Sequence, residues 1–413
     1  MCRKGVFSIF VLFLVAVLAA CGGASQTGGG GGGDTASTSS NTESQASSSS
    51  GAGEIKEYKI GAIYSKTGPN SPLGEPEWNT TLLLEEKINA EGGINGIPLK
   101  VILADDESTQ EKATQEINRL INDEQVLAVL GSSGSGESLA MKGVAMQLEV
   151  PMISAGASMH IVEPASEAYW VFKTPQSDIH AVQRIYIYLQ EQGISNVATL
   201  VDSNAFGTSG LEQLEQQAPD YGINIVAKES YNTQDPDMSA QLTRINSSGA
   251  EVVIVWGTNP GPAIIARNIQ ELGLDLPMVS SHGIANQTFI DLAGEAAENV
   301  VIPTGRLLFP DQIPESDPQY EVISSFYKEY VAKFNSEPTN FASYGYDNLM
   351  LVVEALRAGA TDRASIRDYL ENEIKDWVGA TGIFNFSPED HNGLSADSLV
   401  MATVKNGKWV LLE

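Results

Sequence analysis

From residue 57 onward, short apolar runs alternate with longer segments in which apolar residues recur every three or four positions. The apolar runs have the length of buried strands, and the periodic segments have the spacing of helices that cover a sheet. The first such units are a strand at 58–64, a helix at 75–93 and a strand at 99–106. Strands and helices in this order predict parallel sheets with right-handed crossover connections.

The alternation continues to about residue 304, but it restarts near 171–180 after a short strand. Ser108 and Glu111 have the spacing of a capping box and predict that a helix begins there. Two doubly wound sheets explain this order better than one long sheet. Further strands are predicted at 126–131, 151–154, 197–202, 223–231, 251–257, 276–281 and 299–303.

After residue 304 the pattern changes to three helical stretches, at 317–337, 341–359 and 362–374, with little strand between them. Near the end of the chain, Asn406 and Gly407 stand between two apolar runs. Asn-Gly in that setting is a strong indication of a two-residue hairpin turn, so the chain is expected to end in a β-hairpin.

The amino terminus has the pattern of an export signal. Arg3 and Lys4 precede an apolar run of 15 residues from Val6 to Ala20, which is short for a permanent membrane span. The end of this run, Leu18-Ala19-Ala20-Cys21, resembles the lipobox of bacterial lipoproteins. That resemblance implies a signal peptide at 1–20 and a lipid on the sulfur of Cys21; an ordinary cleaved signal is the alternative.

The segment at 21–53 is dominated by Gly, Ser, Thr, Asn and Gln, a composition that cannot bury enough apolar surface to fold. We therefore expect a flexible tether. The chain has two cysteines, and Cys2 leaves with the signal peptide, so the mature protein has no internal disulfide and no cysteine-based zinc site. With Arg3 and Lys4 removed, 22 basic residues face 52 acidic ones, a charge of about −30 that excludes nucleic acid as a partner.

A glycine-serine segment, Ser132–Gly136, lies between a predicted strand and a predicted helix. Gly136 is followed by Glu137 where a phosphate-binding Walker loop needs lysine, and neither the nucleophile elbow nor the dinucleotide fingerprint is complete. No catalytic residue, metal ligand or cofactor is predicted, because nothing distinguishes one of the four histidines as a base or a ligand: His160, His180, His282 and His391.

This segment is instead expected to be a turn at the carboxyl end of a parallel strand, where α/β proteins bind ligands. The start of the following helix offers unpaired N–H groups, and serine hydroxyls add donors without charge, which suits a small carboxylate. Ordinary capping serines and turn glycines are the alternative that the segment alone leaves open.

The order of motifs along the chain resembles the extracellular substrate-binding proteins of ABC transporters, in particular the leucine/isoleucine/valine-binding family. The resemblance implies the type I periplasmic-binding fold: α/β, with two doubly wound parallel-sheet lobes joined by a hinge of three crossings. It rests on five stretches in the family's order, at 59–74, 88–113, 129–158, 171–178 and 381–394.

The resemblance implies ligand-binding residues. Ser135 and Ser158 match the hydroxyl residues that hold the α-carboxylate of an amino acid, and Gly156 matches the backbone carbonyl that helps to hold its ammonium group. His282 stands where the family has an acidic partner for that ammonium group, and we expect it to titrate near its ordinary pKa of about 6.5. The positions of three covering aromatic residues carry Leu73, Phe206 and Thr258, so only Phe206 keeps the ring.

Together these observations predict a monomeric, lipid-anchored, extracytoplasmic solute-binding protein without enzymatic activity. It would bind an amino acid or a related small carboxylate between its lobes and deliver it to an ABC permease in the membrane. One lobe is expected at 54–178 with 305–380, and the other at 179–304 with 381–413. The alternatives are a ligand-sensing receptor with the same lobes and a secreted serine hydrolase.

Overall fold

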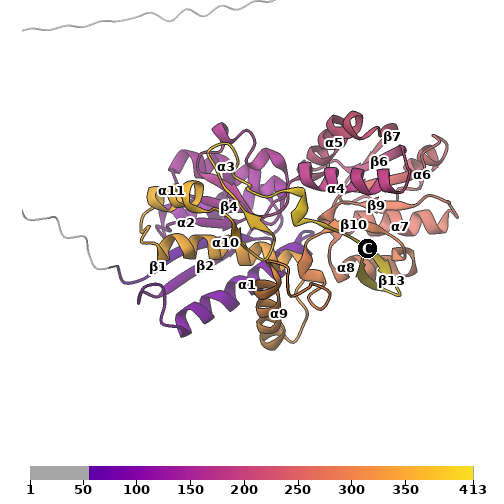
Figure 1. Ribbon diagram of the computed structural model, residues 1–413. Coiled ribbons are helices and arrows are strands. Elements are labelled where there is room, and N and C mark those ends of the chain that lie inside the picture. The colour runs from indigo at the N-terminus through magenta and orange to yellow at the C-terminus, as the bar shows by residue number, and fades with distance from the viewer. Residues whose placement is uncertain (1–54, 413) are drawn as a thin grey trace, which may run out of the picture. The chain divides into compact units, whose positions relative to one another are not determined.

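The computed structural model describes residues 55–412, which form one parallel and one mostly parallel sheet, each covered by helices on both faces (Figure 1). The first sheet has the strand order β2-β1-β3-β4-β5 and is parallel throughout. Its strands are β1 (Tyr58–Tyr64), β2 (Leu99–Asp105), β3 (Val129–Gly131), β4 (Met152–Ser154) and β5 (Val171–Lys173). The second sheet has the order β14-β13-β10-β9-β8-β6-β7, in which β13 (Val400–Lys405) and β14 (Lys408–Leu411) form an antiparallel edge beside β10. Its parallel strands are β6 (Asn196–Asp202), β7 (Asn224–Tyr231), β8 (Val252–Trp256), β9 (Met278–Ser280) and β10 (Val301–Thr304).

The first sheet is buried on both faces, which explains why its strands read as continuous apolar runs. Along β1, Ile60 and Ala62 pack into one hydrophobic cluster and Ile63 into another. The first cluster is covered by α1 (Ser71–Ala90), α10 (Asn340–Arg357) and α11 (Arg363–Glu373), and the second by α2 (Gln110–Asn122) and α3 (Ser135–Leu148). Figure 1 shows α10, in orange, beside the indigo α1, although 250 positions separate Ala90 from Asn340. A further helix, α9 (Tyr320–Phe334), packs with α1 and α10 in a smaller cluster.

The second sheet is covered in the same way. One face carries α4 (Asp178–Glu191) and α5 (Ala205–Gln217), and the other carries α6 (Ser239–Asn246), α7 (Gly261–Glu271) and α8 (Gln287–Ala293). The predicted hairpin is confirmed: β13 (Val400–Lys405) pairs antiparallel with β14 (Lys408–Leu411). Asn406 and Gly407 both have positive φ, 52° and 69°, as this two-residue turn requires. A short ribbon of β11 (Trp377–Val378) and β12 (Ile383–Phe384) completes the strands.

The predicted capping box at Ser108 and Glu111 is wrong by one position. The cap of α2 is Thr109, whose hydroxyl accepts a hydrogen bond from the backbone N–H of Lys112 at 3.3 Å. Ser108 is used elsewhere: its hydroxyl donates to the carbonyl of Thr67 at 2.8 Å and accepts from the N–H of Asn70 at 3.0 Å. Because the Ser108 hydroxyl bonds another loop, Thr109 caps the helix instead.

The chain passes three times between the two sheets, after β5, after β10 and before β13. Gln176 ties the first passage to the last, because its side-chain NH₂ donates to the carbonyls of Thr381 at 3.1 Å and Ser398 at 3.4 Å. Phe384 and Phe386 pack into the core of the first sheet, so we propose that the last lobe boundary lies near residue 395 rather than at 380. The other predicted boundaries remain predictions.

Two helical glycines provide a test of this packing. A Cβ on Gly210 of α5 would lie 2.3 Å from the indole of the buried Trp256 on β8, whereas a Cβ on Gly143 of α3 would meet nothing within 4 Å. We expect Gly210→Ala to lower the free energy of unfolding by about 1–3 kcal/mol through overpacking. Gly143→Ala should raise it by up to about 1 kcal/mol through helix propensity. Urea unfolding of both variants checks this; equal midpoints would contradict the packing of α5 on β8.

Candidate functional site

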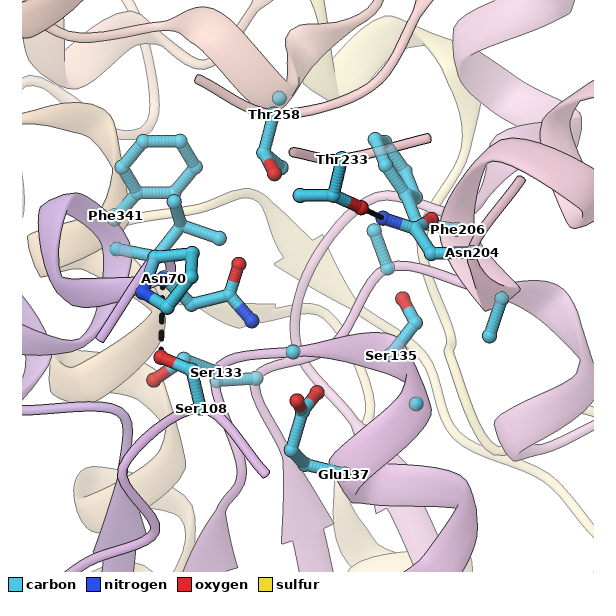
Figure 2. Close-up of a pocket in the computed structure, with 18 of the residues that line it drawn as sticks. Asn70, Ser108, Ser133, Ser135, Glu137, Asn204, Phe206, Thr233, Thr258 and Phe341 are labelled. Atoms are coloured by element: carbon cyan, nitrogen blue, oxygen red, sulfur yellow. Dashed lines mark hydrogen bonds between the residues drawn. The ribbon is translucent and has the colours of Figure 1, made fainter. Parts of the chain in front are cut away.

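A cavity of about 300 Å³ is lined by residues of both lobes, and Figure 2 shows the side chains that surround it. In the first lobe its wall is built from loops that follow the carboxyl ends of consecutive strands. Asn70 and Leu73 come after β1, Ser108 after β2, the segment 133–137 after β3, and Ala155 after β4. This is the edge at which parallel sheets bind ligands.

The second lobe contributes loops at the same edge of its own sheet. Asn204 and Phe206 follow β6, Thr233 follows β7, Thr258 follows β8 and His282 follows β9. The cavity therefore lies where the carboxyl ends of two parallel sheets face each other, and the sequence expectation that the glycine-serine segment forms such a turn is confirmed.

The glycine-serine segment presents the start of a helix to the cavity. Gly131 ends β3, Gly134 caps α3 and Ser135 is its first residue. Among residues 55–412, the backbone N–H groups of Ser135 and Gly136 have no hydrogen-bond partner, as expected for a first helical turn. The Ser135 hydroxyl accepts from the N–H of Ser158 at 3.1 Å and keeps its own proton for another acceptor. This arrangement suits the oxygens of an anion.

Ser133, beside it, is held from below by a buried carboxyl group. Its hydroxyl donates to Glu77 and accepts from the backbone N–H of Ser65 at 3.1 Å. Glu77 is fully buried on α1, and its burial raises its pKa well above the ordinary value. These bonds fix the wall of the cavity at Ser133.

Five of the seven predicted ligand-binding residues line the cavity: Leu73, Ser135, Phe206, Thr258 and His282. Gly156 and Ser158 do not; Ala155 and Ala157, their neighbours, line it instead. A role for these two residues in binding therefore remains a prediction.

Ser158 has another partner. It is fully buried, and its hydroxyl donates to the hydroxyl of Ser209 on α5 at 2.9 Å. That bond crosses from the first lobe to the second. Gly156 packs closely under the helix start, because a Cβ there would lie 3.1 Å from the Cα of Ser135.

Phe206 and His282 contribute rings to the second-lobe wall. The ring of Phe206 stands edge-on to the imidazole of His282, with 5.5 Å between the ring centroids, and is tilted against Trp256, with 5.8 Å between the centroids. His282 is 1% exposed, and neither of its ring nitrogens has a hydrogen-bond partner among the described residues. Burial, together with the nearby Lys173 and His180, lowers the pKa of His282 to about 3. The expectation that His282 titrates near 6.5 is therefore wrong for this structure, since a buried imidazole stays neutral.

The sequence reasoning missed several residues of the wall. Asn204 caps α5 and donates from its side chain to Thr233 at 3.5 Å, while Thr233 donates to Asp202 at 2.8 Å. Asn204 and Thr233 follow strands, so the strand ends could have indicated them. Phe341 and Tyr344 come from α10, where no local pattern points to a cavity.

The sequence analysis used Glu137 only to exclude a Walker loop, but this residue lines the cavity. It is 8% exposed, and burial followed by the charge of Asp106 raises its pKa. No lysine or arginine is among the residues that line the cavity within 55–412. The wall thus combines a helix start, neutral polar groups and one carboxyl group.

The serines of the cavity have no histidine as a hydrogen-bond partner: Ser133 bonds Glu77 and Ser135 bonds Ser158. Over residues 55–412 we find no group of three or more His, Cys, Asp or Glu side chains that could hold a metal ion. In the same range no helix is both long and apolar enough to cross a membrane. Cys21 and the tether lie outside the described residues.

Solved structures with the same fold support this description. An extracellular ligand-binding receptor from Rhodopseudomonas palustris superposes with a TM-score of 0.81 at 26% identity, covering 86% of this chain and 99% of that one. The branched-chain amino acid transporter substrate binding protein LivJ from Streptococcus pneumoniae, in complex with isoleucine, has a TM-score of 0.76 at 27% identity. The superposition covers 86% of this chain and 98% of the LivJ chain.

Sequence comparison identifies the family. An amino acid binding protein of Pseudomonas aeruginosa is 26% identical over 324 residues, which cover 77% of this chain and 83% of that protein. The leucine-, isoleucine-, valine-, threonine- and alanine-binding protein of the same organism is 25% identical over 316 residues, 76% of this chain and 81% of that one. The profile of the family described as periplasmic binding protein matches residues 57–408. The chain therefore belongs to the periplasmic binding protein family, and that membership implies an extracytoplasmic location.

Proposed function

We propose that this protein is the lipid-anchored solute-binding protein of an ABC importer and binds an amino acid or a related small carboxylate. The observation that carries the proposal is the cavity of about 300 Å³, to which both sheets direct the carboxyl ends of their strands. A helix start with free N–H groups and the Ser135 hydroxyl forms one wall, and Phe206, Leu73 and Phe341 provide apolar surface. A small molecule with one anionic end and an apolar part fits these two surfaces.

The names of the relatives support the same ligand class. The Pseudomonas proteins are named for amino acids, and the Streptococcus structure holds isoleucine. In this chain Leu73 and Thr258 replace rings that the family resemblance leads one to expect. Because smaller side chains leave more room, the ligand is not restricted to leucine, isoleucine or valine.

Ligand binding would act by closing the cleft. Because the walls come from two lobes, a ligand that contacts both binds more tightly when they are closed, and its binding energy shifts the population to that form. The permease would recognise the closed form and receive the ligand. No covalent step is required.

The anchor is the lipid on Cys21, reached through the segment at 21–53. A tether of this length would let the binding lobes sample the space around the permease. Both parts of this proposal lie outside the described residues.

Ser135→Ala tests the carboxylate site. Loss of one hydrogen bond to a charged group should weaken binding by about 1.5–3 kcal/mol, or about 10- to 150-fold. A thermal-shift screen of amino acids, their amides and small carboxylates would identify the ligand first, and isothermal titration would then give the Kd. The exposed Ser325 supplies the control, since Ser325→Ala should leave the Kd unchanged. An unchanged Kd for Ser135→Ala would place the ligand elsewhere.

The low pKa of His282 makes a prediction about acid stability. The unfolded chain takes up a proton on this residue near pH 6.5, but the folded protein does so only near pH 3. The stability that comes from the neutral, buried His282 is therefore fully present above pH 6.5. It is lost as the pH falls from 6.5 towards 3, at about 1.4 kcal/mol of unfolding free energy per pH unit. His282→Gln should make the fall in unfolding free energy between pH 6 and 4 shallower by up to that amount, as measured by urea unfolding.

The same pKa implies that His282 does not change charge between pH 8 and 5.5. The pH dependence of ligand affinity in that range should therefore be the same in His282→Gln as in the unmodified protein. If the free energy of unfolding falls with the same slope against pH below pH 6 in the two proteins, His282 is not buried as described.

Cys21→Ser tests the anchor. Without the thiol, no lipid can be attached, and a tether rich in Gly and Ser has no apolar surface that would hold it to a bilayer. We expect loss of metabolic labelling with a fatty acid and release of the protein from the membrane fraction. Retention of the variant in membranes washed with high salt would contradict the lipoprotein assignment.

A further inference from the structure

The charge of the cavity wall is unusual for a site that is proposed to hold a carboxylate. Glu137 is the one Asp or Glu among the lining residues that the structure describes, and no lysine or arginine lines the cavity to balance it. A second-lobe acid, which the family resemblance would place at residue 282, is absent, because a neutral His282 stands there. The wall therefore has one carboxyl group, and it comes from the first lobe.

The position of Glu137 brings it close to the expected carboxylate site. It is the third residue of α3, two positions after Ser135, and Figure 2 shows the side chains of both residues directed to the cavity. The carboxyl group lies over Gly134: a Cβ on that glycine would be 2.0 Å from Oε2 of Glu137 and 2.8 Å from the side-chain nitrogen of Asn70. The glycine leaves the space that the carboxyl group occupies.

Glu137 has no charged partner that would explain its burial. Its side chain makes no ion pair among residues 55–412; its own backbone N–H lowers its pKa, but burial outweighs this, and the charge that acts on it is that of another acid, Asp106. A buried carboxylate without a cation is unfavourable, as its raised pKa reflects. A cationic group in the cavity would remove this penalty.

His282 points to a ligand independently. Both of its ring nitrogens are buried without a partner, and it lines the cavity opposite the first lobe. A neutral imidazole offers one donor and one acceptor, and leaving both unpaired is costly. Polar atoms of a bound molecule would satisfy this side chain.

We propose that Glu137 binds the ammonium group of the ligand, so that the site takes a zwitterionic amino acid rather than a simple carboxylate. The carboxylate would lie at Ser135 and the start of α3, and the ammonium group beside Glu137. The two charged groups of an α-amino acid are neighbours, and the carboxyl group of Glu137 reaches back over Gly134, the residue directly before Ser135. This inference rests on the proposed function and assigns to the first lobe the acid that is missing from the second.

The charges also determine what the site rejects. A carboxylate without an amine would bring a second negative charge beside Glu137 and gain no ion pair. An amine without a carboxylate would pair with Glu137 but leave the helix start empty. The zwitterion alone satisfies both groups.

The experiment compares matched ligands on two proteins. Titration calorimetry would measure the binding of the twenty L-amino acids, and of the analogues of the tightest binder that lack the amine or the carboxylate. The unmodified protein should bind the amino acid at least about 10-fold more tightly than the analogue without the amine. Glu137→Gln should weaken binding of the amino acid by about 10- to 100-fold. The same variant should bind the analogue without the amine with a Kd that is at most about threefold higher, or lower, than that of the unmodified protein.

Two further variants complete the test. Glu111→Gln makes the same chemical change at an exposed position in the first turn of α2 and should alter neither affinity. Glu137→Asp keeps the charge on a shorter side chain and should lose less affinity for the amino acid than Glu137→Gln does. It serves as the test if the glutamine variant does not fold.

The possible failures are distinct. If the amino acid binds and Glu137→Gln changes its Kd by less than about threefold, the inference is overturned and the proposed function stands. If the analogue without the amine binds as tightly as the amino acid, the inference is also overturned, because Glu137 then acts as a protonated donor. If neither amino acids nor the small carboxylates of the screen bind, the proposed function itself fails.

Discussion

Parallel strands that belong to one sheet all end at the same edge, and this constraint places most of the site. Each strand end must release the chain into a loop, and each following helix begins with N–H groups that the helix itself cannot pair. In the first lobe that edge presents the segment 133–137, and in the second it presents Asn204, Thr233 and His282. The cavity is thus formed by backbone geometry, and its specificity is left to the few side chains that the loops carry.

The contact between the lobes is polar and buried. Asp178, at the start of α4, accepts from the hydroxyl of Ser209 on α5 and from the N–H of Met159 in the first lobe at 3.2 Å. Within the first lobe, Lys173 at the end of β5 donates to the carbonyl of Ala157 at 2.5 Å. Desolvation lowers the pKa of Lys173 to about 8 and raises that of Asp178 to about 6. Each opposite charge moderates the other's shift. Because buried polar groups are costly without partners, opening the lobes has to offer them water or new bonds, which favours discrete arrangements over gradual ones.

The sequence predicted the layers and the place of the site, but not its detailed chemistry. The strands were visible because a sheet buried on both faces needs apolar residues at most positions, as in β1, and the hairpin because Asn406 and Gly407 tolerate positive φ. The helix cap was missed at Ser108, whose hydroxyl is taken by Thr67 and Asn70 from another loop. The neutrality of His282 could not be predicted either, since its cause is the packing of Phe206 and Trp256 around it. Local patterns report local structure, whereas burial and pKa depend on segments that are distant in sequence.

The same distinction applies to residues carried over from a family. A resemblance transfers the position of a loop reliably, because the loop follows from the sheet, but it transfers a chemical role only if the neighbours are also kept. The hydroxyl of Ser158 donates to the hydroxyl of Ser209 in the other lobe. At residue 282, an imidazole without hydrogen-bond partners stands where the family resemblance implies an acid. The remaining carboxyl group in the wall is that of Glu137. Because a buried charge needs a counter-charge, this residue becomes the candidate partner of a cationic group on the ligand. In a site built from loops, conservation of the fold therefore leaves the charge arrangement free to change.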